Sequence, residues 1–122
     1  MTTIKAACLG VIGCAAVWSG CASTLPAERV AAPRAAIRAA EEMGAYNVPR
    51  ASLHLKLAKD QVAQADALIR DDEQERAAWV LTRADADAEL ALLLAREQRV
   101  LEEAAAVRNQ IHELQQRTTP KS

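Results

Sequence analysis

The chain has 122 residues, a formal net charge of −1, no phenylalanine, one tyrosine and two tryptophans. This length allows one small domain at most. The near-zero net charge argues against nucleic-acid binding, which needs a basic patch or stripe. The sequence contains no phosphate-binding glycine-rich loop, nucleophile elbow or spaced Cys/His metal motif. It therefore predicts no catalytic residue, no metal site and no cofactor site.

Residues 1–20 have the pattern of a signal peptide. Lys5 is their only charged residue, and an apolar run of about fourteen residues follows it. A membrane-spanning helix needs roughly 20 apolar residues, and Gly10 and Gly13 interrupt this run. We therefore expect a cleaved signal peptide, with a short uncleaved anchor as the alternative.

Ser19-Gly20-Cys21 resembles the end of a bacterial lipobox, where signal peptidase II cuts before a cysteine that carries lipid. The lipobox pattern has Leu, Val or Ile three residues before the cysteine, where this chain has Trp18. Val11-Ile12-Gly13-Cys14 fits that position better, but cleavage there would leave a hydrophobic region of only about eight residues. Cys21 is therefore the predicted lipidation site, and Cys14 is the alternative.

The cysteine count also favours cleavage before Cys21. An odd thiol in an exported protein calls for explanation, and this cleavage removes Cys8 and Cys14 while lipid modifies the third cysteine. A cysteine with more than one acyl chain anchors a protein stably. The next residue is Ala22 rather than Asp, which in the enterobacterial sorting rule implies the outer membrane. We expect covalent diacylglycerol and acyl lipid on Cys21, at the periplasmic face of the outer membrane.

The remaining sequence favours helices, because Ala, Leu, Arg, Glu and Gln dominate it. Residues 21–32 are expected to form a tether that can become helical, with Ser23 or Thr24 as a cap. Pro33 either starts the first helix or kinks a longer one, and Gly44 is a natural stop after residue 43.

A second helix is predicted over residues 49–70, with Pro49 in its first turn. Leu53-His54-Leu55-Lys56-Leu57 alternates like a strand, but the apolar residues beyond it recur at helical steps. The predicted buried face consists of Leu55, Ala58, Val62, Ala65 and Ile69.

Asp71-Asp72-Glu73 predicts a turn, and Asp72 with Glu75 resembles a capping box. The alternative is one continuous helix, since neither Gly nor Pro stands here. A third helix then runs over residues 73–117 and would be about 65 Å long.

The third helix has two apolar stripes. Its first half has small residues that allow close helix packing, namely Ala77, Ala84, Ala88, Ala91 and Ala95. Its second half has a heptad seam of larger residues, namely Leu93, Val100, Ala104, Val107, Ile111 and Leu114. We predict an all-α domain over residues 33–117, in which a short helix accompanies a long antiparallel hairpin with coiled-coil character. Residues 118–122 are expected to form a disordered tail.

The first two predicted helices are together shorter than the third, so the distal seam lacks a partner within the chain. We expect it to bind another copy or a different envelope protein. The predicted function is a structural or protein-interaction role without catalysis. The alternative is an adaptor that docks through the distal seam on an envelope complex, such as a cell-wall or efflux component.

Residues 35–49 read AAIRAAEEMGAYNVP and are followed by Leu55-Lys56-Leu57-Ala58-Lys59 and a long Ala/Leu/Arg helix. This pattern resembles bacterial lipoproteins of the domain of unknown function 4398 family. The resemblance covers roughly residues 21–105 and implies a lipobox before a small all-helical domain. It carries over no catalytic residue.

Three other groups of side chains are not expected to form a functional site. His54 and His112 are not expected to bind metal, because no further ligands stand at defined spacing. Trp79 is expected in the core. Asp85, Asp87 and Glu89 do not share one helix face and are expected to form a solvated surface.

Overall fold

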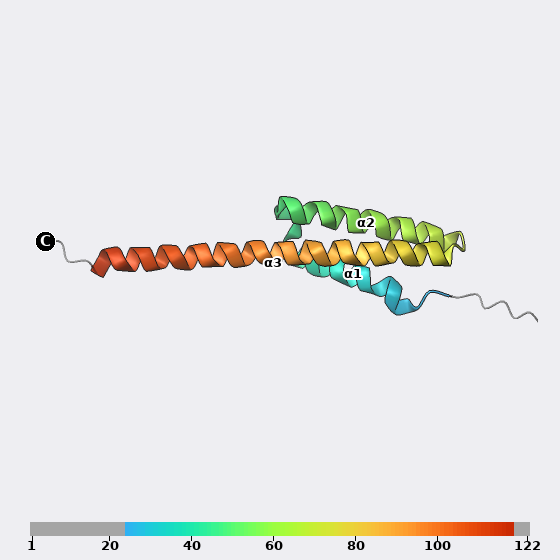
Figure 1. Cartoon of the computed structure of the whole chain (residues 1–122), viewed down its shortest axis with the longest axis horizontal. Coiled ribbons are helices and arrows are strands. Elements are labelled where there is room, and N and C mark those ends of the chain that lie inside the picture. The colour runs from blue at the N-terminus through green and yellow to red at the C-terminus, as the bar shows by residue number, and fades with distance from the viewer. Residues whose placement is uncertain (1–23, 119–122) are drawn as a thin grey trace, which may run out of the picture.

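The computed structural model describes residues 24–118, which form an all-α fold without strands. Its elements are α1 (Ala27–Glu42), the 3₁₀ turn η1 (Ala45–Asn47), α2 (Pro49–Arg70) and α3 (Gln74–Thr118). Helices α1 and α2 lie along the first half of α3, and the second half of α3 extends beyond them (Figure 1). The predicted signal peptide, Cys14, Cys21 and residues 119–122 lie outside the described residues.

Helix α1 begins at Ala27, so the last six residues of the expected tether are helical. Pro26 occupies the N-cap position without a side-chain cap, where we expected Ser23 or Thr24. Pro33 therefore lies inside a longer helix, which was one of the two expected arrangements, and its ring is fully buried. Burial of this ring offsets part of the cost, about 3 kcal/mol, of proline inside a helix.

The connection between α1 and α2 follows the sequence prediction. Gly44 has a φ of 80°, a left-handed conformation that suits glycine, and its N–H donates to the carbonyl oxygen of Glu41 at 2.9 Å. Val48 is extended at the N-cap of α2, and Pro49 is the first helical residue. The strand-like alternation after Pro49 is helical in the structure.

A turn at Asp72 separates α2 from α3, so the continuous-helix alternative is wrong. Asp72 has a φ of 61°, and its N–H donates to the carbonyl oxygen of Ile69. The N–H of Glu73 donates to the carbonyl oxygen of Leu68 at 2.8 Å, which completes a Schellman motif. Asp72 thus ends α2, and the expected capping box is wrong because α3 begins two residues later, at Gln74.

The predicted alanine stripe of α3 is buried, and both other helices pack against α3. Small side chains let α1 and α2 approach closely, so one helix serves both neighbours. The buried face of α2 includes Leu68, where we expected Ile69, which is only partly buried. The buried residues of α2 are Ala51, Leu55, Ala58, Val62, Ala65 and Leu68.

Trp79 was expected in the core, and this expectation is wrong. Its exposed fraction is 70%. Successive helix residues are about 100° apart, so Trp79 points about 200° away from the buried Ala77. The alanine stripe therefore faces α1 and α2, and the indole faces outward.

We expect the variant Ala88→Leu to lower the free energy of unfolding by about 1–3 kcal/mol, because Ala88 is fully buried and a larger side chain would force the helices apart. The same change at the exposed Ala105 should have little effect. Chemical denaturation followed by circular dichroism measures both. Equal stabilities of the two variants would contradict close packing at Ala88.

Candidate functional site

The five residues predicted to form the interaction seam are all on the surface of α3. Their exposed fractions lie between 51 and 62%. At about 100° per residue they fall within a stripe about 60° wide along the helix. Scattered apolar residues are normal on protein surfaces, but an aligned row of large ones marks an interaction surface. The row consists of Leu93, Val100, Val107, Ile111 and Leu114.

The exposed stripe also continues back over the part of α3 that α1 and α2 cover. Steps of seven residues lead from Trp79 through Ala86 to Leu93, and Leu90 stands four residues after Ala86. All four side chains are exposed. Sequence analysis missed this extension because it assigned Trp79 to the core. The whole row, from Trp79 to Leu114, is called the outer seam below.

The outer seam and the alanine stripe lie on opposite sides of α3. Ala84, Ala88 and Ala91 are fully buried, whereas Ala86 and Leu90 between them are exposed. In its first half α3 therefore faces α1 and α2 mainly with alanines, together with Leu81 and Leu94, whereas Leu90 and Leu93 face outward.

The second half of α3 extends past the other helices (Figure 1). The turn between α1 and α2 lies beside Ala95 and Arg99, and the Nη1 atom of Arg99 is 3.7 Å from the Sδ atom of Met43. Every residue from Arg99 to Thr118 is exposed. The sixteen residues from Glu103 onward form about 24 Å of exposed helix.

The first described residues lie at the opposite end of the molecule from this exposed segment (Figure 1). Thr24, Pro26 and Arg29 line a hollow together with Gln74 and Ala78 at the start of α3. A chain held through residue 21 would therefore have the exposed end of α3 pointing away from its attachment point.

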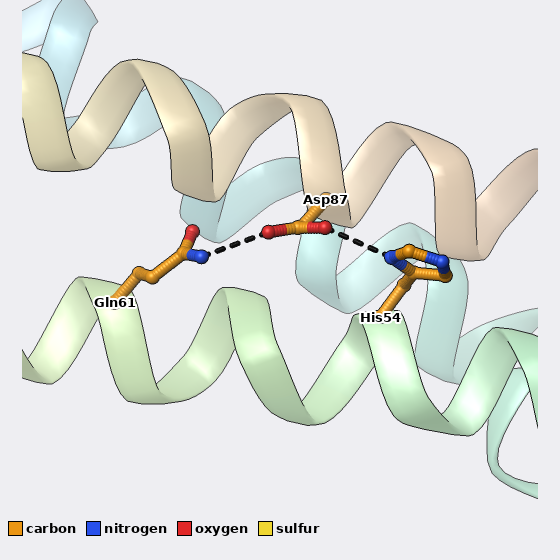
Figure 2. A network of polar contacts seen from close by, with 3 residues as sticks. All are labelled: His54, Gln61 and Asp87. Carbon is orange, nitrogen blue, oxygen red and sulfur yellow. Dashed lines mark hydrogen bonds and ion pairs between the residues drawn. The ribbon is translucent and has the colours of Figure 1, made fainter.

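A polar network joins α2 to α3 inside the bundle (Figure 2). The Nδ1 atom of His54 lies 2.8 Å from Oδ1 of Asp87, and the Nε2 atom of Gln61 donates to Oδ2 of Asp87 at 2.8 Å. The Asp87 side chain is only 22% exposed, so our expectation of a solvated surface is wrong for this residue. Sequence spacing along α3 could not reveal it, because both partners lie on another helix.

The network sets the ionisation of Asp87. Partial burial alone would raise the pKa of Asp87. The hydrogen bonds from His54 and Gln61, with the charges of His54 and Arg83, outweigh burial and hold this pKa below its ordinary value. The arrangement supports a structural role, because it ties the two longest helices together.

The structure does not bring the two histidines together. His112 is exposed on the far part of α3, and its Nε2 atom lies 3.0 Å from Nε2 of Gln116. Within residues 24–118, no group of three or more His, Cys, Asp or Glu side chains is placed to hold a metal ion. Among the same residues, no helix is both long and apolar enough to cross a membrane.

No protein-family model, curated protein or solved structure matches this chain. The resemblance to lipoproteins of the domain of unknown function 4398 family therefore stays a prediction.

We expect Asp87→Asn to lower the free energy of unfolding by about 1 kcal/mol at neutral pH, because an amide cannot accept both hydrogen bonds as a carboxylate does. A depressed folded-state pKa contributes stability that is present above the unfolded pKa, about 3.9, and is lost as pH falls through the folded value. The difference between variant and wild type should therefore shrink below about pH 4.

Chemical denaturation across pH 3–7 measures this difference, with Glu89→Gln as the control because Glu89 is exposed on the same helix. A difference that stays constant through the acid range would show that the Asp87 carboxylate does not stabilise the fold.

Proposed function

We propose that this protein is a lipoprotein of the bacterial envelope, anchored through lipid on Cys21 at the periplasmic face of the outer membrane. Its role is structural or protein-binding, without catalysis, and it acts through the outer seam of α3. The observation that carries this proposal is the aligned row of large, half-exposed apolar side chains on a helix that extends beyond its own bundle.

The energetics favour a bound partner for the seam. Fully burying a Val, Leu or Ile side chain contributes about 1.5–3 kcal/mol, so covering the exposed halves of five of them would contribute on the order of 5 kcal/mol. Part of this offsets the entropy lost on association. A helix segment of about sixteen residues without tertiary packing is also marginal in water, and a partner would stabilise it.

The position of the first described residues supports a membrane-anchored arrangement. Thr24 is three residues after Cys21, and an extended chain of that length spans about 11 Å at most. Thr24 lies beside the start of α3, so lipid on Cys21 would hold this end near the membrane. The exposed half of α3 would then extend away from the membrane.

A second candidate is an adaptor that docks on an envelope complex, such as a cell-wall or efflux component. The projection of α3 beyond the bundle favours it, because residues 103–118 are accessible to a partner from every side. The two candidates share the anchor and the seam and differ in the partner.

We expect Cys21→Ser to abolish palmitate labelling and to release the protein from the outer-membrane fraction, because the thiol is the proposed site of lipid attachment. Cys14→Ser should keep both properties. Metabolic labelling followed by membrane fractionation measures the two variants. A Cys21→Ser protein that still incorporates palmitate and sediments with the outer membrane would contradict anchoring at Cys21.

We expect a photo-crosslinking residue at position 107 to form a protein adduct in intact envelopes, because Val107 lies on the outer seam. The same probe at position 109 is the control, since Asn109 is equally on the surface but on the opposite side of the helix. Mass spectrometry identifies the adduct. Equal adduct yields at the two positions would rule out a specific interaction through the seam.

A further inference from the structure

We infer that the partner of the outer seam is a second copy of the same chain, parallel and in register, so that two α3 helices form a two-stranded coiled coil. The parallel direction rests on the proposed lipid anchor. The pairing of the two copies rests on the residues of α3 themselves.

The outer seam has the heptad pattern of a coiled coil along most of α3. In a coiled coil, two series of residues, each with a spacing of seven, alternate along the contact. Leu90, Ala104 and Ile111 belong to the second of these series. The pattern extends over about five heptads, beyond the three or four that typify a coiled coil. The first series is Trp79, Ala86, Leu93, Val100, Val107 and Leu114.

Charges beside the seam fit an in-register parallel pair. Glu103 immediately precedes Ala104, and Arg108 immediately follows Val107. In a parallel, in-register pair, Glu103 of each copy would therefore lie across from Arg108 of the other. Within residues 24–118 Arg108 has no ion-pair partner, and Glu103 pairs only with the exposed Arg99, at 3.1 Å. An exposed pair of this kind contributes little, so Glu103 is available to a second copy.

Two charged residues lie at alternate-layer positions of the seam, Arg83 between Trp79 and Ala86 and Glu97 between Leu93 and Val100. In a parallel, in-register pair the two Glu97 side chains would face each other, and Arg96 of each copy would flank Glu97 of the other. Neither Arg96 nor Glu97 has an ion-pair partner among residues 24–118 of one chain. Polar layers of this kind cost stability but fix the register of a coiled coil.

The bundle leaves room for this pairing. The buried residues of α3 lie on the side away from Leu90 to Leu114, so α1 and α2 leave this part of the seam open. At the start of α3, Arg29 of α1 and Trp79 line the same hollow. Trp79, close to the start of α3, is exposed and would lie at the anchored end of the seam.

The proposed anchor selects the parallel direction. In an antiparallel pair the two starts of α3 would lie about 70 Å or more apart. The residues between Cys21 and Thr24 span about 11 Å at most, so both anchors could reach one membrane only if the pair lay flat on it. A parallel pair places both anchors at the same end, whatever the angle between the coiled coil and the membrane.

Disulfide trapping of the full chain in native envelopes tests the inference. Single cysteines replace Val100, Val107 or Leu114, and Asn109→Cys is the control on the opposite side of α3. Lipid blocks the thiol of Cys21, and Cys8 and Cys14 leave with the signal peptide. Mild oxidation should give a disulfide-linked homodimer at each of the three seam positions and far less at position 109.

A second comparison uses Val100→Cys as the reporter. Adding Val107→Asp should lower the homodimer yield about tenfold or more, because it places a charge in the middle of the seam. Adding Asn109→Asp should leave the yield unchanged. Both additions change an exposed residue, so neither is expected to disturb the bundle.

Palmitate labelling of the same samples separates this inference from the proposed function. A labelled, membrane-bound protein whose seam cysteines form no homodimer overturns the second-copy inference and leaves the proposed anchor intact. Homodimers at only one seam position overturn the parallel register. An unlabelled protein that forms homodimers at all three seam positions but not at position 109 contradicts the anchor and supports the pairing.

Discussion

Close packing of α1 and α2 against the alanine stripe of α3 is the interaction on which the rest of the structure depends. Methyl side chains let both helices approach α3 closely, so α3 serves as the centre of the bundle. The bond from His54 to Asp87 then ties α2 to α3 on the border of this contact. Glycine at position 44 and a left-handed Asp72 give the two turns that fold the helices back.

Using small residues for the inner contact has a consequence for the outer face. Leu81 and Leu94 are buried, but most of the large apolar residues of α3 are exposed, and α3 is longer than the helices that cover it. An ordinary amphipathic helix buries its largest side chains against its own domain. Here a row of large apolar side chains lies on the surface of α3 from Trp79 to Leu114. The charged residues Glu103 and Arg108 flank this row. The same helix thus holds its bundle together with one face and has exposed apolar residues on the other.

Much of this fold follows from the sequence. The helices, the stops at Gly44 and Asp72, the alanine stripe and the distal seam are all local patterns, and local patterns are visible in one chain. Three features depended on tertiary packing instead. Burial of Pro33 let α1 begin early, the inner alanines turned Trp79 outward, and the partners of Asp87 came from α2. None of these could be predicted from spacing along a single helix.

The account depends most directly on the exposed half of α3 having a partner in the envelope. Amide hydrogen exchange of residues 103–118, compared between dilute purified protein and native envelopes, measures this. We predict fast exchange in the dilute protein and strong protection in envelopes, while the amides of residues 77–95 are equally protected in both. Equal exchange of residues 103–118 under the two conditions would contradict the account, because the outer seam would then have no partner.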